Sequence, residues 1–305
     1  MDTRLIEYIL MIAEENNITH AAAKLFITQS ALNQQLIKLE KELGAPLFHR
    51  SRTNWHLTEA GEIYVKNAKE MMRLKRETYQ TISDLTDGKY GHLSVGFTSG
   101  RGINMFTEVY ASFYQIYPNI IIQPMEGIVR NLQKRIAQGE LDVAFLTLTD
   151  KDRTEDVYEN IFKEELLLAI PAKHPLAETK KAEGADFGTI DIRHLRYEPF
   201  VVMDKSSTMR TMVDTIFSEA GISPKILFET GNNHTIISMI RSNLCCGIIP
   251  YYYAKDLDPR EIACFHLLSR PFWQFTASYK RGSYLGKPAR CFIDLMKKHW
   301  GEKGD

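Results

Sequence analysis

The sequence predicts a chain of three successive parts: a small helical region, one long helix and a larger α/β region. Apolar residues recur at spacings of three and four up to Gly44, and no proline or glycine occurs between Gly61 and Gly88. From His92 onward, short β-rich runs alternate with amphipathic stretches. These patterns are typical of short helices, of one continuous helix, and of strands that alternate with helices. At 305 residues the chain is also long for a single domain.

The composition is that of an ordinary globular protein, with 44% hydrophobic residues, 25% charged residues and a formal net charge of zero. The amino terminus has carboxylates on both sides of its apolar run, unlike a signal peptide. No apolar run approaches the roughly 18 residues that a membrane span needs. We therefore expect a cytoplasmic protein with no membrane partner, in which any contact with nucleic acid depends on locally placed basic residues.

The four cysteines predict reduced thiols and no metal centre. They are Cys245, Cys246, Cys264 and Cys291, and none stands in a CxxC or Cys/His ligand spacing. We expect a reducing compartment, no structural metal and no cofactor. A thiol switch at the adjacent Cys245 and Cys246 is a minor alternative, because adjacent cysteines rarely bond to each other and both begin an apolar run that predicts a buried strand.

Up to Gly44 the pattern predicts three helices. In the first, over residues 3–15, Leu5, Ile9 and Ile12 form one apolar stripe. We expect Thr19 to cap a second, shorter helix and Thr28 to cap a third. The third helix has its own apolar stripe and a glycine stop, formed by Leu32, Leu36, Leu39, Leu43 and Gly44. Two short helices joined by a tight turn, the second one polar at its start, are typical of a helix-turn-helix.

Polar side chains at the start of the third helix can donate and accept hydrogen bonds at base edges in the major groove of DNA. Basic residues outnumber acidic ones by three between residues 24 and 56, which suits phosphate contacts. The candidate DNA-binding residues are Thr28, Gln29, Ser30, Asn33, Gln34, Lys38, Arg50 and Arg52. On periodicity alone, a small helical domain with solvated caps explains the same pattern equally well.

The run ITHAAAKLFITQSALNQQLIKLEKELGAPLFHRSRTNWHLTEAG resembles the N-terminal signature of the LysR-type transcriptional regulators. The resemblance lies in the alanines of the second helix and in the ordered motifs TQSAL, LEKELG, PLFHR and LTEAG. It implies a winged helix-turn-helix in which residues 46–57 form the wing, with Arg50 and Arg52 reaching the DNA backbone. The chain departs from the family at Asn33, where serine is frequent, and near Thr53, where a basic residue is usual.

After Thr58 the sequence predicts a helix over residues 58–86, which would be roughly 43 Å long. A heptad-like seam with two polar interruptions runs along it, formed by Tyr64, Ala68, Met71, Lys75, Thr78, Ile82 and Leu85. Such a stripe needs a partner helix, or else packing against the chain's own domains. Resemblance to the family favours a dimer, and implies a tetramer that binds an operator with two half-sites and contacts RNA polymerase if it activates transcription.

In the last part, strands alternate with helices, which predicts α/β lobes. The runs ELLLAIPAKHPLA and FHLLSRPFWQFTASY look like the two strands that cross between lobes in this family. The resemblance therefore implies a two-lobed α/β domain of the periplasmic-binding-protein type, with an effector in the cleft. The expected domains are a DNA-binding domain at 1–58, a linker helix at 59–88 and an effector domain at 91–305. Its lobe I would hold 91–163 and 268–305, and its lobe II 164–267.

The ends of the predicted strands supply candidate effector contacts. They are Thr98, Ser99, Gly100, Arg101, Ile128, Thr147, Thr149, Met203, Asp204, Ser206 and Thr230. Two helix N-termini facing one cleft favour an anion, which Arg101, Lys205 or Arg210 would reinforce. Asp204 instead favours an ammonium or a hydroxyl, so an amino acid or hydroxy acid stays open. The alternative is that these serines and threonines are ordinary helix caps.

No catalytic motif accompanies these patterns: GxSxG, GxGxxG, the P-loop and HExxH are all missing from the sequence. We therefore expect a regulator and not an enzyme. The working hypothesis is a homo-oligomeric, sequence-specific DNA-binding regulator whose lobes shift when a small molecule enters the cleft. A small-molecule scavenger without regulatory output is the second hypothesis, and the helix-turn-helix argues against it.

Overall fold

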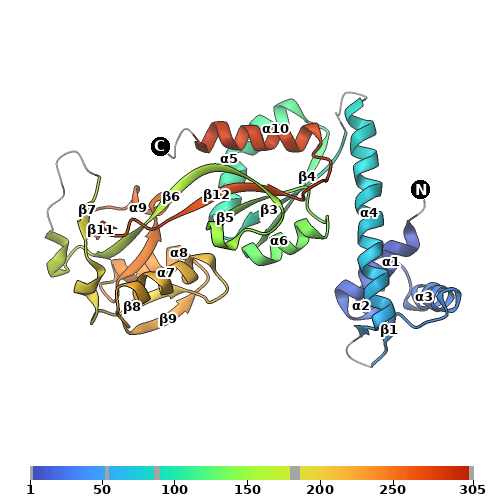
Figure 1. Cartoon of the computed structure of the whole chain (residues 1–305), viewed down its shortest axis with the longest axis horizontal. Helices are drawn as coiled ribbons and strands as arrows, with labels where there is room; N and C mark the ends of the chain where they lie inside the picture. Colours follow the sequence, from blue (N-terminus) through green and yellow to red (C-terminus); the bar gives the residue numbers. More distant parts are fainter. Residues whose placement is uncertain (1–2, 52–54, 86–89, 179–185, 302–305) are drawn as a thin grey trace.

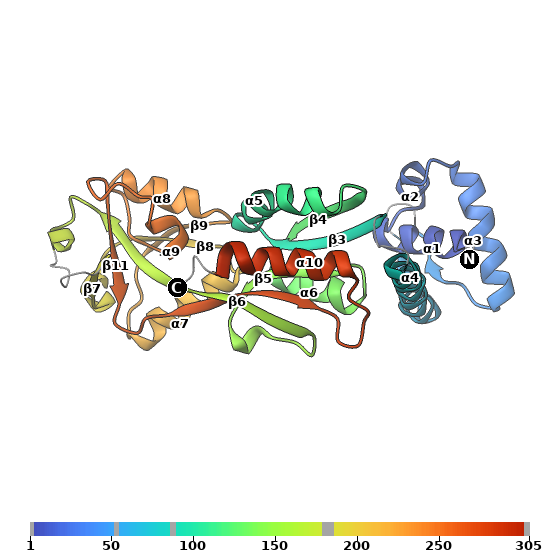
Figure 2. The ribbon, with the colours of Figure 1, turned by 90° about the horizontal axis from the view of Figure 1, so that it is seen from above.

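The computed structural model describes residues 3–51, 55–85, 90–178 and 186–301. Viewed from above, three parts lie in a row: the N-terminal helices with α4, then a lobe that contains α5, α6 and α10, then a lobe that contains α8, β7 and β11 (Figure 2). The N-terminal elements are α1 (Arg4–Glu15), α2 (Ile18–Lys24), α3 (Gln29–Leu43), β1 (Phe48–His49), β2 (His56–Leu57) and α4 (Glu59–Leu85).

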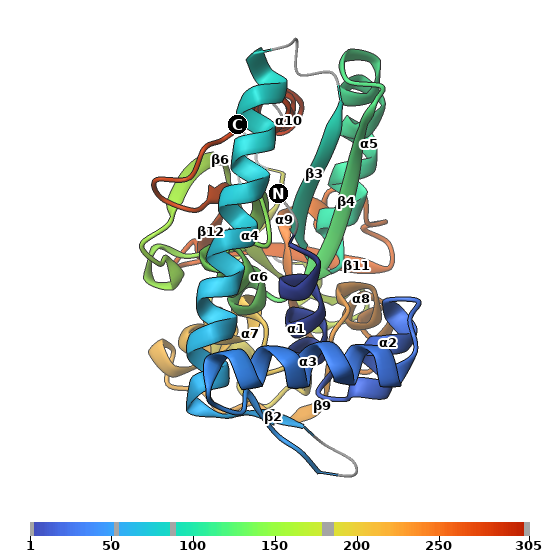
Figure 3. The same ribbon diagram turned by 90° about the vertical axis from the view of Figure 1, so that its right-hand side faces the viewer.

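The first three helices pack around one apolar core. Ile9 and Ile12 of α1, Ala21 of α2, and Leu32 and Leu36 of α3 are all buried in it. Burial of these stripes stabilises helices that are too short to be stable alone. Figure 3 shows α3 lying across the end of the molecule, with β2 of the wing beneath it.

Two of the three predicted helix boundaries are confirmed, and one is wrong. The Thr28 hydroxyl accepts from the backbone N–H of Ala31 at 3.2 Å, and Gly44 ends α3 in the left-handed conformation at φ 70°. The predicted cap Thr19 instead lies inside α2. Asn17 is the cap, because its side-chain oxygen accepts from the backbone N–H groups of Thr19 and His20 at 2.8 and 3.1 Å.

The two lobes share one long strand. The remaining strands are β3 (Gly91–Thr98), β4 (Ile120–Gly127), β5 (Val143–Leu148), β6 (Val157–Pro171), β7 (Gly188–Ile190), β8 (Phe200–Met203), β9 (Ile226–Thr230), β10 (Gly247–Pro250), β11 (Ile262–Leu267) and β12 (Phe272–Tyr279). The first part of β6 pairs with β12, and from Leu166 onward it pairs with β10 and β11. The crossing predicted for ELLLAIPAKHPLA therefore occurs in β6 (Figure 1).

The second predicted crossing strand is interrupted. The run FHLLSRPFWQFTASY forms the end of β11 and then β12, separated by residues 268–271. Arg270 adopts a left-handed conformation at φ 45°, and Pro271 has no N–H to donate to a neighbouring strand. These two residues explain why the strand breaks where the chain passes from one lobe to the other.

Helices cover the sheets of both lobes (Figures 1 and 2). They are α5 (Arg101–Ile116), α6 (Val129–Ala137), α7 (Thr208–Glu219), α8 (Asn233–Arg241), α9 (Tyr251–Ala254) and α10 (Lys287–Met296). In the first lobe, β3 is parallel to β4 and β5, and β12 is antiparallel to β5. Since the parallel strands end at one edge, the residues that follow β3, β4 and β5 come together there.

Candidate functional sites

The start of α3 presents polar side chains to solvent. Thr28, Gln29, Ser30, Gln34 and Lys38 are exposed. Asn33 is half-buried, and the Thr28 hydroxyl, which caps the helix, lies 3.2 Å from Oγ of Ser30. Leu32, Leu36 and Leu39 of the same helix are buried, whereas Leu43 at its end is 48% exposed, so the helix separates an apolar face from a polar one over most of its length. The structure thus brings six of the candidate DNA-binding residues together on one helix.

The wing is fastened to α3 through Glu40. One oxygen of this carboxylate accepts from the backbone N–H of Leu47 at 2.8 Å, and the other forms an ion pair with Arg50. The Arg50 guanidinium also lies 5.6 Å from the centre of the Trp55 ring. These contacts hold the Arg50 side chain in place, and because it stays 39% exposed, a phosphate can still reach it. The other predicted wing residue, Arg52, lies outside the described residues.

A cavity of about 270 Å³ lies between the lobes. Seven of the predicted effector residues line it: Thr98, Ser99, Ile128, Thr147, Met203, Asp204 and Ser206. Further lining residues come from both lobes and were not predicted as contacts, namely Thr208, Met209, Gly231, Asn233, Pro250, Tyr253 and Trp273. Tyr253 of α9 lies three residues after Pro250, whereas Trp273 of β12 is far along the chain from Thr147, and only the pairing of β12 with β5 brings these two together.

The cavity has hydroxyl groups on one side and a carboxylate on the other. Oγ1 of Thr98 and Oγ1 of Thr147 lie 3.3 Å apart at the ends of β3 and β5. Oδ1 of Asp204 accepts from the backbone N–H of Ser206 at 2.9 Å and from its hydroxyl. Oδ1 of Asn233 is buried with no hydrogen-bond partner. An unpaired buried acceptor is costly, and a donor on a bound molecule would satisfy it.

Two helices begin at this cavity without a side-chain cap. The N-caps of α6 and α7 are Ile128 and Ser207, and the side chain of neither accepts a hydrogen bond from the backbone of its helix. By contrast, the caps of α2, α3 and α8 all do. The first N–H groups of an uncapped helix carry partial positive charge. This edge of the cavity therefore favours carbonyl or carboxylate oxygens.

Three predicted effector residues are not among the described lining residues, and the side chain of a fourth, Arg101, is not described. Thr149 forms a capping box with Asp152. The Thr230 hydroxyl accepts from the backbone N–H of Asn232 at 3.3 Å. Gly100 is the N-cap of α5 at φ 89° and supports the turn only. Arg101 begins α5, but its side chain lies outside what the structure describes.

Arg210 does not supply the positive charge that was expected to bind an anion. Its guanidinium pairs with Asp214 and Glu229, both at 2.8 Å, and donates to the carbonyl of Met203 at 3.0 Å. The hydrogen bond that Arg210 donates to Glu229 is the main reason why the pKa of Arg210 is raised. Lys205 is exposed and also lies outside the lining. Asp204 is thus the one charged residue among the described lining residues.

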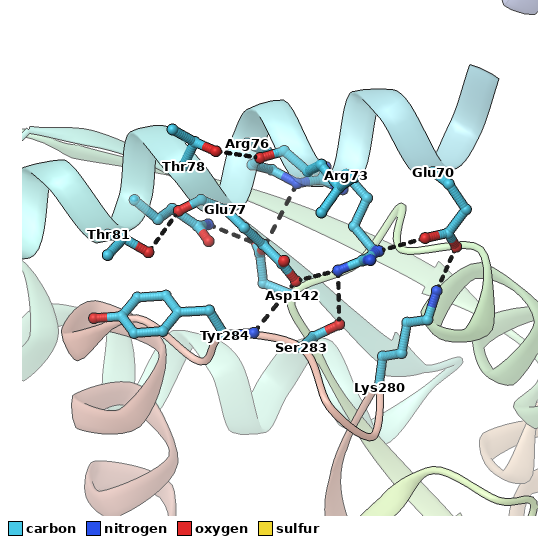
Figure 4. A network of polar contacts seen from close by, with 12 residues as sticks. Glu70, Arg73, Arg76, Glu77, Thr78, Thr81, Asp142, Lys280, Ser283 and Tyr284 are labelled. Atoms are coloured by element: carbon cyan, nitrogen blue, oxygen red, sulfur yellow. Dashed lines mark hydrogen bonds and ion pairs between the residues drawn. The ribbon is translucent and has the colours of Figure 1, made fainter. Parts of the chain in front are cut away.

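Sequence reasoning missed a polar joint between α4 and the first lobe (Figure 4). Glu70 binds Lys280, and Arg73 pairs with Glu70 and Glu77 at 2.8 and 2.6 Å. The hydrogen bond from Lys280 is the main cause that lowers the pKa of Glu70. Charged residues at spacings of three and four along α4 were the available signal, but such pairs are usually solvated and do not reveal a partner domain.

Further toward the end of α4, two carboxylates complete this joint. Asp142 accepts from the side-chain amide of Gln80 at 3.1 Å, and Asp84 accepts from the hydroxyl of Tyr284 and the backbone N–H of Lys287, both at 2.8 Å. The side of α4 that carries Gln80 therefore packs on the lobe. Met71, Ile82 and Leu85 of the predicted apolar stripe lie on another side of α4 and remain at least 55% exposed, so packing against the first lobe does not cover them.

Three of the four thiols, those of Cys245, Cys246 and Cys264, are buried, and that of Cys291 is half-buried. Burial raises the pKa of Cys245 to about 11 and that of Cys246 and Cys264 to about 12. All four cysteines are free. Within the ranges given above, the structure contains no group of three or more His, Cys, Asp or Glu residues arranged for a metal ion. Among the same residues, no helix is both long enough and apolar enough to span a membrane.

Two family models match the chain in succession. The model described as "Bacterial regulatory helix-turn-helix protein, lysR family" matches residues 3–62. The model described as "LysR substrate binding domain" matches residues 86–301. The first match contains α1 to α3 and the wing, and the second contains both lobes and the cavity between them.

Curated relatives are similar along nearly their whole length. The Bacillus subtilis (strain 168) protein described as "Uncharacterized HTH-type transcriptional regulator YwbI" is 28% identical over 309 residues, which cover 100% of this chain and 99% of the relative. The "Probable RuBisCO transcriptional regulator" of Cyanidioschyzon merolae (strain NIES-3377 / 10D) is 32% identical over 297 residues, which cover 93% of this chain and 94% of the relative.

Two solved structures share the fold. Full-length OxyR from Pseudomonas aeruginosa has a TM-score of 0.70 at 22% identity, covering 98% of this chain and 94% of that chain. CbnR complexed with its target DNA has a TM-score of 0.63 at 20% identity, covering 98% of this chain and 99% of that chain. The arrangement of helix-turn-helix, long helix and two lobes is therefore common to all three chains.

Proposed function

The chain belongs to the LysR family of DNA-binding transcriptional regulators, and we propose that α3 and the wing read its operator while a small molecule binds between its lobes. It is a regulator and not an enzyme. The observation that carries the proposal is the polar start of α3, exposed beside a wing that Glu40 holds in place. Gln29 and its neighbours would contact base edges, and Lys38 and Arg50 would contact phosphates.

The proposed domain division follows from this reading. Residues 1–58 bind DNA, residues 59–88 form the linker, and residues 91–305 bind the effector. Lobe I then holds 91–163 and 268–305, and lobe II holds 164–267. Because its target is operator DNA, we place the protein in the cytoplasm.

A second copy of the chain is the proposed partner of α4. Met71, Leu74, Ile82 and Leu85 are each at least 55% exposed and share one face of the helix. Gln80 and Arg73, which contact the first lobe, lie about half a turn away. Pairing of two α4 stripes would give a dimer that presents two α3 helices to two half-sites, and two dimers would form the tetramer. A contact with RNA polymerase belongs to this proposal if the protein activates transcription.

The proposed effector is a small molecule with a carboxylate and an ammonium group. Uncapped helix N-termini supply one edge of the cavity, and the carboxylate of Asp204 and the unpaired Oδ1 of Asn233 supply acceptors. Among the described lining residues, no cation would offset the repulsion between Asp204 and a plain dianion. The volume of about 270 Å³ is slightly below the roughly 300–1,000 Å³ of pockets for drug-sized ligands, which favours a compact molecule.

A thermal-shift screen tests the effector proposal. Amino acids, hydroxy acids, plain dicarboxylates and sugars are compared, and a ligand at a hundred times its Kd should stabilise the protein by about 2.7 kcal/mol. We expect an amino-acid-like hit that Asp204→Asn weakens and that the control Asp256→Asn, at an exposed surface position, leaves unchanged. Stabilisation by plain dicarboxylates alone, unaffected by Asp204→Asn, would reject this effector class.

A further inference from the structure

Phe26, in the turn between α2 and α3, is exposed to an unusual degree. Its side chain is 95% exposed, the highest value for a large hydrophobic residue among those that the structure describes. Its neighbours in the turn, Leu25 and Ile27, pack against the core of the N-terminal helices. Burial in the fold therefore explains Leu25 and Ile27 but gives no reason for a phenyl ring between them.

The backbone at Phe26 is also unsuited to phenylalanine. Its φ is 55°, in the left-handed region. The N–H of Phe26 donates to the carbonyl of Ala23 at 3.2 Å, and the N–H of Ile27 donates to the carbonyl of Ala22 at 3.1 Å. These two bonds form a Schellman motif, in which glycine, or sometimes asparagine, occupies the left-handed position. Gly44 ends α3 in that way, at φ 70°. Phe26 therefore carries a conformational cost that the fold does not offset.

The location of Phe26 supplies a reason for it. It stands two residues before Thr28, the cap of α3, and three before Gln29. With consecutive Cα atoms about 3.8 Å apart, its Cα lies within roughly 8 Å of that of Thr28. In a helix-turn-helix, the N-terminal end of the second helix enters the major groove. An exposed aromatic ring at this end of the helix would lie near the edges of the bases, where the methyl group of thymine is the apolar feature.

We propose that Phe26 is a specificity residue whose ring packs on a thymine methyl group at the outer edge of the bases that α3 reads. This rests on the proposed role of α3 in reading DNA. The contact gives the exposed ring an apolar partner only when operator DNA is bound. It adds a preference for thymine to a helix start whose other exposed side chains are polar.

The experiment uses the full chain and an operator that the wild-type protein selects from random DNA. This operator is compared with a series of duplexes, in each of which one thymine is replaced by deoxyuridine, which removes only the methyl group. The variants are Phe26→Asn, Gln29→Ala and the control Tyr197→Asn, which removes another exposed aromatic, 88% exposed in the second lobe. Asparagine suits the left-handed backbone, so Phe26→Asn should unfold at the same temperature as wild type or above it.

We expect Phe26→Asn to lose operator affinity by roughly five- to tenfold. At one thymine position, replacement by deoxyuridine should lower the operator affinity of the wild type by a similar factor. Phe26→Asn should be insensitive to that substitution, and Tyr197→Asn should behave as wild type.

If Gln29→Ala weakens binding while Phe26→Asn keeps full affinity and full sensitivity to deoxyuridine, this inference fails and the proposed function stands. If Gln29→Ala has no effect either, the assignment of α3 as the reading helix fails with it. A Phe26→Asn protein that keeps operator affinity but loses oligomeric state would assign the ring to a protein contact and overturn the proposal.

Discussion

The side-chain amide of Gln80 on α4 donates a 3.1 Å hydrogen bond to Oδ1 of Asp142, just before β5. The other oxygen of Asp142 accepts from the backbone N–H of Ser94 in β3 at 2.7 Å. At their opposite ends, these same two strands carry Thr98 and Thr147 into the interlobe cavity. One carboxylate therefore ties the linker helix to both strands that lead to the cavity.

Asp142→Asn should destabilise the protein. The side chain of Asp142 is 11% exposed, and an asparagine has one acceptor oxygen where the carboxylate has two, so either Ser94 or Gln80 loses its acceptor. We expect a loss of about 1–3 kcal/mol in the free energy of unfolding, measured by urea titration. The control is Asp150→Asn, whose side chain is 75% exposed and which should change stability by less than about 0.5 kcal/mol. Equal midpoints for both variants would contradict the role given to Asp142.

Glu159 should make the stability depend on pH below 4.5. Burial alone would raise the pKa of this carboxyl, but hydrogen bonds from Lys297, Tyr279 and Arg290 outweigh burial and lower the pKa from 4.5 to about 2. A group with a lowered pKa in the folded state stabilises the protein above its unfolded pKa, and this stability is lost as the pH falls from 4.5 toward 2.

The shift corresponds to roughly 3 kcal/mol at most. In Glu159→Gln, the free energy of unfolding should be lower at pH 6, and the fall between pH 4.5 and pH 2 should be correspondingly smaller, measured by urea titration at each pH. A variant that keeps the full acid dependence of the wild type would remove Glu159 as its source.

Alkylation should leave Cys245, Cys246 and Cys264 unmodified in the native protein. Burial raises the pKa of each of these thiols well above 9, so the reactive thiolate is scarce at pH 8. Iodoacetamide followed by mass spectrometry should label these three sites only after denaturation. Rapid labelling of Cys245 or Cys246 in native protein, together with a change in DNA binding, would instead support the thiol switch.

Arg50→Ala should weaken binding to all DNA sequences. The guanidinium of Arg50 is held beside α3 by Glu40, where a phosphate contact needs no further ordering. Loss of one phosphate contact should flatten the slope of log Kd against log salt by about one unit. Arg260→Ala, at a side chain 88% exposed in the second lobe, is the matched control and should keep the slope. The same slope for both variants would exclude Arg50 from the phosphate contacts.

The sequence predicted those features of the fold that depend on residues close together in the chain. The leucine stripe of α3, its Thr28 cap and its Gly44 stop depend on residues within one turn of each other, and all three are present. The cavity residues that directly follow a strand, such as Thr98 and Asp204, also line the cavity as expected. Strand ends in an α/β lobe converge for topological reasons, so their order in the sequence is enough to place them.

Contacts between segments far apart in the chain could not be predicted from the sequence. Arg210 was expected to face an anion, but the paired strand β9 brings Glu229 within 2.8 Å of it, and an ion pair forms there. Trp273 reaches the cavity from the far end of the chain through β12. The prediction at Thr19 failed for a local reason, since two adjacent asparagines precede it and Asn17 forms the cap first.

The central claim is that Gln29 and its neighbours on α3 read base sequence. The most direct measurement is the difference in binding free energy between a selected operator and random DNA of the same length, for the wild type and for Gln29→Ala at one salt concentration. If Gln29 contacts a base, the variant should lose about 1–3 kcal/mol of that difference while its affinity for random DNA is unchanged. An equal loss on both DNAs, or none on either, would contradict the account.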